Sequence, residues 1–189
     1  DEIQAGLGRT GKMFAIEHWN LCPDMITVAK GIGGGLPLGA FITTEQIAEA
    51  FEPGDHYTTF GGNPISCTAG LKTIEIIQRD GLAENASRVG NYFIKRLNEL
   101  KERHPLLGDV RGKGLMVGIE LVKDEKTKTP AAKEAASIQD MMRERGVLVT
   151  LSGDSTIRML PPLIVTTEHV NTVVEALGDA IKQIEKGDG

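Results

Sequence analysis

The stretch ITVAKGIGGGLPLG, residues 26–39, decides the fold and the chemistry that we predict for this chain. A short apolar run at 25–29 predicts a buried strand that ends on Lys30, and a loop rich in glycine follows at once. Such a loop lets the backbone turn sharply and pass close to a ligand. A lysine at the end of a buried strand suits a Schiff-base nucleophile, because desolvation lowers the pKa of its amine. On this stretch alone, a surface lysine that begins a turn is the simpler interpretation.

The composition is that of an ordinary globular protein and excludes several classes. The 189 residues are 40% hydrophobic and 25% charged, with a formal net charge of −5 and no basic run, which argues against a nucleic-acid partner. No apolar stretch approaches the roughly 18 residues of a membrane span, and no signal peptide opens the chain. The two cysteines fit neither a metal site nor a disulfide framework. We therefore predict a cytoplasmic protein that binds neither nucleic acid nor a membrane.

The first half of the chain predicts short elements separated by loops. Residues 1–11 (DEIQAGLGRTG) have the pattern of a strand end followed by a loop, and we expect the chain to be a fragment that lacks the start of that strand. Thr43 or Thr44 is predicted to cap a helix at 45–51, with the capping-box pattern Thr43-x-x-Gln46. The expected elements are a short helix at 12–18, strands at 25–29 and 38–43, and helices at 45–51 and 65–79.

The second half predicts amphipathic helices around a small sheet. Apolar residues recur at helical spacing over 82–103 and alternate over 114–122, which predicts a long helix and then a strand with one buried face. A helix at 131–145, strands at 147–151 and 156–160, and a last helix capped by Thr166 or Thr167 follow. The order predicts an α/β fold class with two domains, 1–104 including the linking helix and 105–189 as a small βαββα unit.

Four polar side chains suit the demands of pyridoxal 5'-phosphate. That cofactor needs a lysine for an imine, a carboxylate facing its ring nitrogen and donors for its phosphate. Lys30 meets the first demand, Asp1 at a strand end meets the second, and the neighbouring hydroxyls of Thr58 and Thr59 in a glycine loop meet the third.

Four motifs carry a resemblance to a known family. DEIQAGLGRTGK at 1–12, PDMITVAKGIGGGLPLGA at 23–40, HYTTFGGNP at 56–64 and IRMLPPL at 157–163 resemble the class III (ornithine or 4-aminobutyrate type) pyridoxal-phosphate aminotransferases. The similarity runs over nearly the whole chain, and the order and spacing of the motifs are specific. GIGGG alone would be weak evidence for a nucleotide-binding module, because it lacks the Lys-Ser/Thr ending of a P-loop and does not fit G-x-G-x-x-G.

The resemblance implies a role for five residues. Asp1 matches the aspartate that pairs with the pyridine nitrogen, and Gln4 matches the glutamine beside the ring hydroxyl. Lys30 matches the lysine that holds the cofactor as an internal aldimine and moves the substrate proton. Thr59 matches the threonine that reaches the cofactor phosphate of the neighbouring subunit. Arg158 matches the arginine that binds the substrate α-carboxylate. The family implies a homodimer of fold type I with active sites at the interface.

Each position also has a structural interpretation. Asp1 and Gln4 can serve as polar turn residues, and Thr59 as a loop hydroxyl that satisfies the backbone. Arg158 has apolar neighbours in its predicted strand, and an arginine in such a place usually pairs with a carboxylate, which can belong to the chain itself. The four histidines show no spacing typical of a metal site, so we predict none.

The chain departs from the family pattern in length. Family members are about twice as long, and their N-terminal half supplies a phosphate-binding glycine/serine loop and the aromatic ring that stacks on the cofactor. The resemblance therefore implies the second part of the large domain plus a C-terminal α+β small domain. It also implies that these residues alone do not form a complete active enzyme.

The function that the resemblance implies is ping-pong transamination. An amino acid or ω-amino acid would give its nitrogen to the cofactor, and a 2-oxo acid such as 2-oxoglutarate would accept it. The motifs slightly favour the 4-aminobutyrate or related ω-amino group over acetylornithine. Two alternatives stay open: a sibling racemase, decarboxylase or aminomutase, and a non-catalytic truncated fragment or paralogue that acts as a binding module.

Overall fold

The computed structural model describes residues 1–187, which form parts of two compact units, Asp1–Glu84 and Asn85–Gly189. The predicted domain boundary near residue 104 stays a prediction, but the contacts group most of helix α3 (Leu82–Lys101) with the second unit. The reason is that Val89, Phe93 and Leu97 of α3 are buried in the core of that unit.

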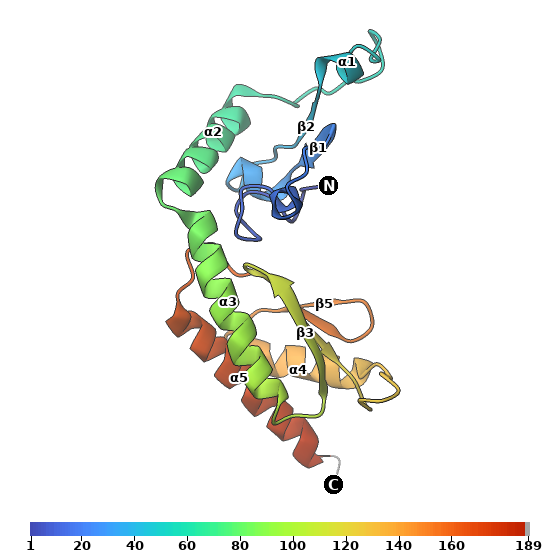
Figure 1. Cartoon of the computed structure of the whole chain (residues 1–189), viewed down its shortest axis with the longest axis vertical. Helices are drawn as coiled ribbons and strands as arrows, with labels where there is room; N and C mark the ends of the chain where they lie inside the picture. The colour runs from blue at the N-terminus through green and yellow to red at the C-terminus, as the bar shows by residue number, and fades with distance from the viewer. Residues whose placement is uncertain (188–189) are drawn as a thin grey trace. The chain divides into compact units, whose positions relative to one another are not determined.

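The first unit contains short elements around a two-stranded antiparallel sheet (Figure 1). In this sheet Met25 pairs with Thr43 and Val28 with Ala40. Only Val28 of the first strand is buried, so the prediction of a buried strand is wrong for most of its residues, because one neighbouring strand covers only one edge of it. The elements are η1 (Ala15–Trp19), β1 (Met25–Val28), η2 (Lys30–Gly33), β2 (Ala40–Thr43), α1 (Glu45–Ala48) and α2 (Pro64–Arg79).

The helices α1 and α2 of the first unit begin differently: a side chain caps α2, and none caps α1. The side chain of Asn63 accepts a hydrogen bond from Ser66 N and so caps α2, and Pro64 occupies the first turn of this helix. Thr44 precedes α1 without a side-chain capping bond. The predicted capping box is wrong, because Thr43 belongs to β2 and its hydroxyl donates to Asp24 O at 3.0 Å.

The second unit is a four-stranded antiparallel sheet with three helices. Its strand order is β3-β4-β6-β5. The prediction of a βαββα unit missed β3, because LGDVRGK has little apolar alternation and forms a strand through its pairing with β4. The elements after α3 are β3 (Leu107–Lys113), β4 (Met116–Leu121), α4 (Ala132–Glu144), β5 (Thr150–Ser152), β6 (Thr156–Met159) and α5 (Thr167–Gly187).

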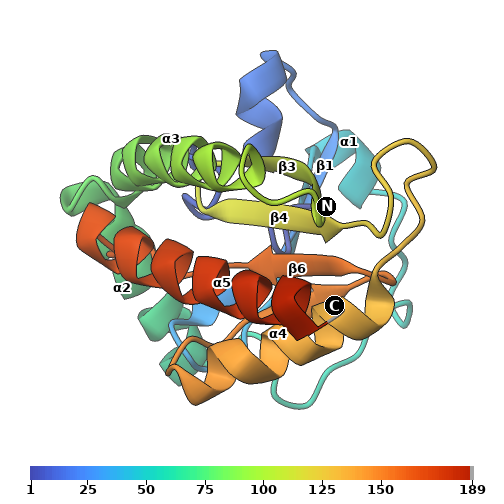
Figure 2. The same cartoon turned by 90° about the horizontal axis from the view of Figure 1, so that it is seen from below.

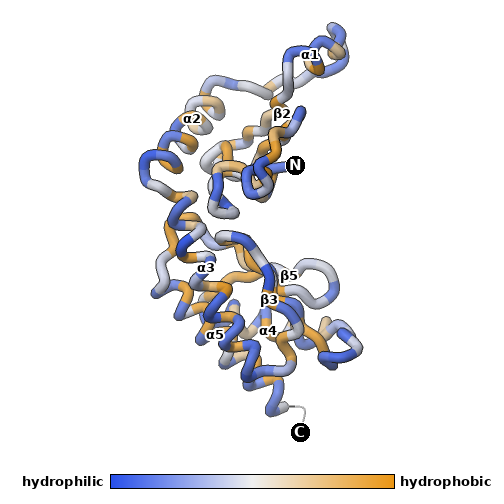
Figure 3. Tube along the Cα trace, in the orientation of Figure 1, coloured by the Kyte–Doolittle hydropathy of each residue, from blue (hydrophilic) through white to orange (hydrophobic). Residues whose placement is uncertain are grey.

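One face of this sheet is apolar and the other is polar. Val117, Ile119 and Leu121 alternate with less buried residues along β4 and form one core with residues of α3, α4 and α5. The three helices therefore cover a single face of the sheet (Figure 2). Apolar residues recur at helical spacing along α3 and α5, as amphipathic helices require, and hydrophobic and hydrophilic segments follow one another along both (Figure 3). Among residues 1–187, no helix combines the length and the apolar character that crossing a membrane requires.

Candidate functional site

A buried carboxylate anchors the first residues of the chain. Glu2 is 6% exposed, and its backbone N–H donates to Thr27 O of β1 at 2.9 Å. Its two carboxylate oxygens accept hydrogen bonds from Ala15 N at 3.0 Å and Ile16 N at 2.9 Å, at the start of η1. Glu2 therefore joins the segment that carries Asp1 and Gln4 to both β1 and η1. Sequence reasoning missed this residue, because its partners lie far along the chain.

Lys30 and Gln4 are brought together across 26 positions of sequence. Lys30 Nζ donates to Gln4 Oε1 at 3.3 Å. Lys30 has a φ of 52°, in the left-handed region that residues other than glycine rarely adopt, and such backbone strain concentrates at functional sites. The side chain of Lys30 is exposed, so the desolvation expected from a buried strand end is not provided by residues 1–187.

The glycines after Lys30 form a tight turn. The predicted loop contains one turn of 3-10 helix, η2, which ends at Gly34 with a φ of 58°. Gly35 follows with a φ of 107°, and a side chain there would meet no atom within 4 Å. The glycines thus permit a backbone path that residues with a side chain rarely adopt.

Asp1 lies in the same unit but makes a local contact. Its Oδ1 atom accepts a hydrogen bond from Ile3 N at 2.8 Å. Asp1 also lines a hollow of about 240 Å³ together with Glu2, Trp19 and Met25. Within residues 1–187 no hydrogen bond joins Asp1 to Lys30, so the structure unites Lys30 with Gln4 alone.

The loop that carries Thr59 is exposed and is shaped by its neighbours. Thr58 Oγ1 accepts a hydrogen bond from Gly61 N at 2.9 Å, and Asn63 Nδ2 donates to Phe60 O at 2.9 Å. Thr59 is exposed, and its hydroxyl forms no hydrogen bond with any other described residue. The structural interpretation, a hydroxyl that satisfies the loop backbone, therefore fits Thr58 and not Thr59.

Arg158 lies on β6 of the second unit. Its Nε atom donates to Thr150 Oγ1 at 3.3 Å, and no carboxylate of residues 1–187 forms an ion pair with it. Arg111 on β3 differs, because its Nη1 atom lies 2.8 Å from Asp109 Oδ2 and 2.6 Å from Glu120 Oε2. The hydrogen bond to Asp109, and after it the bond to Glu120, raises the pKa of the Arg111 guanidinium above its ordinary value. The internal carboxylate partner considered for Arg158 is therefore not found among the described residues.

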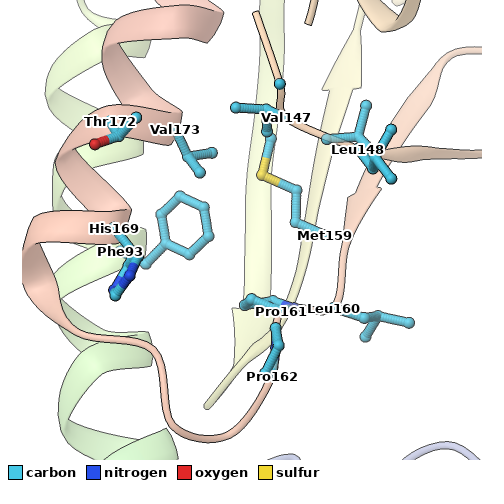
Figure 4. Close-up of a pocket in the computed structure, with 12 residues that line it drawn as sticks. Phe93, Val147, Leu148, Met159, Leu160, Pro161, Pro162, His169, Thr172 and Val173 are labelled. Carbon is cyan, nitrogen blue, oxygen red and sulfur yellow. The ribbon is translucent and has the colours of Figure 1, made fainter. Parts of the chain in front are cut away.

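An apolar pocket lies elsewhere in the second unit (Figure 4). It has a volume of about 370 Å³, and side chains such as Phe93, Val147 and Met159 line it. His169, at its edge, uses Nδ1 to accept from Thr166 N at 3.2 Å. The pocket offers few groups for a charged substrate. In residues 1–187 no cluster of three or more histidine, cysteine or acidic side chains could hold a metal ion.

Replacement of Glu2 by alanine is expected to destabilise the first unit. The change leaves the N–H groups of Ala15 and Ile16 without their charged acceptor, which costs about 2 kcal/mol. The measurement is urea unfolding followed by the fluorescence of Trp19, the one tryptophan of the chain. Glu17→Ala is the matched control: it removes an exposed carboxylate that accepts from Phe14 N and should cost less than half as much. Equal effects of the two variants would contradict the anchoring role of Glu2.

Comparisons with known proteins agree with one another. A family model described as "Aminotransferase class-III" matches residues 1–181. The chain is 47% identical over 94% of its length to "Alanine--glyoxylate aminotransferase 2 homolog 2, mitochondrial" of Arabidopsis thaliana, and covers 38% of that protein. It is 44% identical over 99% of its length to "Leucine/methionine racemase" of Thermococcus litoralis, and covers 42% of it.

A solved structure shows the same fold. The acetylornithine aminotransferase of Elizabethkingia anophelis superimposes with a TM-score of 0.87 and 33% identity, over 96% of this chain and 44% of that one. The chain thus spans less than half the length of each of these proteins.

Proposed function

The chain belongs to the class III aminotransferase family, which confirms the predicted resemblance and α/β fold, and we propose that it carries the catalytic lysine of a pyridoxal-phosphate-dependent transamination. The observation that carries this proposal is the pair Lys30 and Gln4, with Nζ 3.3 Å from Oε1 on a strained backbone. Transamination of the whole protein is the activity that this pair, Arg158 and the family support best.

The residues present fit pyridoxal phosphate. Lys30 offers an exposed primary amine, Gln4 an amide and Thr59 a hydroxyl without a partner among residues 1–187. Lys30 would hold the cofactor through its amine, with Gln4 beside the ring hydroxyl and Asp1 at the ring nitrogen. Thr59 would bind the phosphate of the neighbouring subunit's cofactor. When bound, the cofactor supplies an electron-withdrawing ring that stabilises negative charge at the substrate Cα.

Two protein groups manage the substrate. Nζ of Lys30 takes the proton from the substrate Cα and later returns a proton, and the hydrogen bond to Gln4 keeps this amine in place. The guanidinium of Arg158 binds the substrate carboxylate, since no carboxylate of the described chain occupies it. The substrates we propose are an amino donor and a 2-oxo acid.

The finer assignments concern assembly, location and substrate preference. We propose a homodimer, because the first unit exposes large apolar side chains such as Tyr57 and Phe60, at 85% and 81%. A cytoplasmic location and a preference for 4-aminobutyrate over acetylornithine stay predictions. Racemisation is the second candidate function, because one of the relatives is named a racemase. This reaction would require the same proton transfer at Cα.

Borohydride reduction in the presence of pyridoxal phosphate tests the proposed role of Lys30. Reduction turns the imine into a stable amine, so peptide mass spectrometry should find the pyridoxyl group on the Lys30 peptide. Lys30→Ala should remove this adduct, whereas Lys12→Ala, which changes an exposed lysine outside the site, should leave it unchanged. An adduct spread evenly over surface lysines would disprove the assignment.

Nitrogen transfer then separates transamination from racemisation. An aminotransferase moves ¹⁵N from a labelled amino acid to 2-oxoglutarate, which mass spectrometry detects as labelled glutamate. A racemase scrambles the configuration of the amino acid and leaves 2-oxoglutarate unlabelled. We expect labelled glutamate.

A further inference from the structure

The polar face of the second unit's sheet brings two arginines into one cross-strand row. The register pairs Arg111 of β3 with Gly118 of β4, Gly118 with Arg158 of β6, and Arg158 with Thr150 of β5. Residues directly opposite one another in antiparallel strands project to the same side of a sheet. The four residues therefore share the face that the helices leave uncovered.

The two arginines of this row have different partners. Arg111 is neutralised by Asp109 and Glu120, and its Nη2 atom donates to Thr156 Oγ1 at 3.4 Å. The partner of Arg158 is a neutral hydroxyl, that of Thr150. Arg158 is thus the arginine of the row that keeps an uncompensated charge within residues 1–187.

We propose that Thr150 is the positioning residue for Arg158 and orients its guanidinium for bidentate capture of the substrate carboxylate. This inference rests on the proposed function, in which Arg158 binds that carboxylate. Thr150 Oγ1 accepts from Nε of Arg158 at 3.3 Å and donates to the backbone carbonyl of Arg158 at 3.4 Å. One hydroxyl therefore binds both the backbone carbonyl and the side chain of Arg158.

Thr150 binds Arg158 at Nε and leaves the edge of the guanidinium formed by Nη1 and Nη2 open. Hydrogen bonding at Nε restricts rotation of the arginine side chain and leaves Nη1 and Nη2 without a partner in the described chain. These two nitrogens form the fork that matches the two oxygens of a carboxylate. The bonds to Thr150 are long, and such bonds often shorten when the substrate arrives.

Gly118 separates the two arginines in this row. The register places it between Arg111 and Arg158, and a Cβ there would lie 3.4 Å from Thr156 Cγ2 and 3.9 Å from Arg111 Cγ. The row thus has a charged fork, a hydroxyl that orients it and a residue without a side chain next to it.

The test replaces the hydroxyl without changing the shape of the side chain. In the whole protein, Thr150→Val should raise KM for 2-oxoglutarate by about three- to ten-fold, with kcat changed less than about two-fold, because a hydrogen bond to a charged group is lost. Thr150→Ser should restore KM. Thr156→Val is the matched control. It removes a hydroxyl from the same face of the sheet, but this hydroxyl binds Arg111 and not Arg158, so KM should stay unchanged.

A binding measurement makes the result independent of turnover. Glutarate, a dicarboxylate without a reactive carbonyl, should bind the protein in calorimetry with a Kd that rises by the same factor in Thr150→Val. An unchanged Kd and KM, equal effects of the two valine variants, or no binding of glutarate by the wild type would overturn the proposal.

Two further results separate this inference from the function on which it rests. If Arg158→Lys leaves KM and Kd unchanged, the substrate role of Arg158 is wrong and the role of Thr150 falls with it. If Arg158→Lys weakens binding but Thr150→Val does not, only the positioning role is wrong. The pyridoxyl adduct on Lys30 should form in all these variants.

Discussion

Replacement of Lys30 by alanine in the whole protein is expected to lower kcat for transamination by about 10⁴-fold or more. In the proposed function this amine would both attach the cofactor and move the Cα proton, and its hydrogen-bond partner among residues 1–187 is the amide of Gln4, which cannot replace it. Steady-state rates with an amino donor and 2-oxoglutarate measure this loss. Activity within ten-fold of the wild type would exclude Lys30 as the catalytic base.

The backbone at Lys30 provides a control for folding. Because its φ of 52° strains any residue with a Cβ atom, Lys30→Gly should be more stable than Lys30→Ala by about 1 kcal/mol. Both variants should be inactive. If Lys30→Gly is at least as stable as the wild type and still inactive, the loss of activity is due to the missing amine. If Lys30→Gly recovers activity, the inactivity of Lys30→Ala is due to misfolding.

Replacement of Gly90 by alanine is expected to destabilise the second unit by about 3 kcal/mol or more. Helix α3 lies directly against the turn between β3 and β4, and a Cβ at Gly90 would overlap the backbone carbonyl of Gly114. Backbone atoms of a turn cannot rotate away as a side chain can, and Gly114 itself has a φ of 55°. The helix and the hairpin would have to separate, which opens the core around Val89 and Phe93.

Thermal unfolding followed by far-ultraviolet circular dichroism measures this effect. A loss of this size should lower the Tm by about 10 °C or more. Gly178→Ala is the matched control, because it also adds a Cβ to a buried helical glycine but meets the flexible end of Leu100 at 3.1 Å. It should change stability by less than about 1 kcal/mol, since alanine favours the helix. Equal Tm values for the two variants would show that α3 can move away from the turn.

Patterns within short stretches of sequence determined much of this protein. The sequence alone predicted α3 and α5 from apolar residues that recur at helical spacing, α2 from Asn63-Pro64 at its start, and α4 from Gly146 after its end. It predicted β4 from strict alternation. The four motifs predicted the family over nearly the whole chain, and the family model confirms this. The roles of Asp1, Gln4, Lys30, Thr59 and Arg158 stay predictions.

Features that depend on distant residues were decided by the tertiary structure. The strand β3 exists because β4 pairs with it, and Glu2 is buried because N–H groups more than ten positions away need an acceptor. The requirement for glycine at Gly90 comes from the turn at Gly114, which follows the rest of α3 and the strand β3.

The same holds for the side chains of the candidate site. The sequence placed Lys30 and Gln4 in separate motifs, and folding brings their polar atoms within hydrogen-bonding distance. The partners of an arginine in a strand come from its own strand and from its neighbours. Asp109 lies two positions from Arg111 on β3, whereas Glu120 reaches Arg111 from β4 because the two strands are paired. The register places Thr150 opposite Arg158, so strand pairing, which local sequence does not encode, decided that the partner of Arg158 is a hydroxyl.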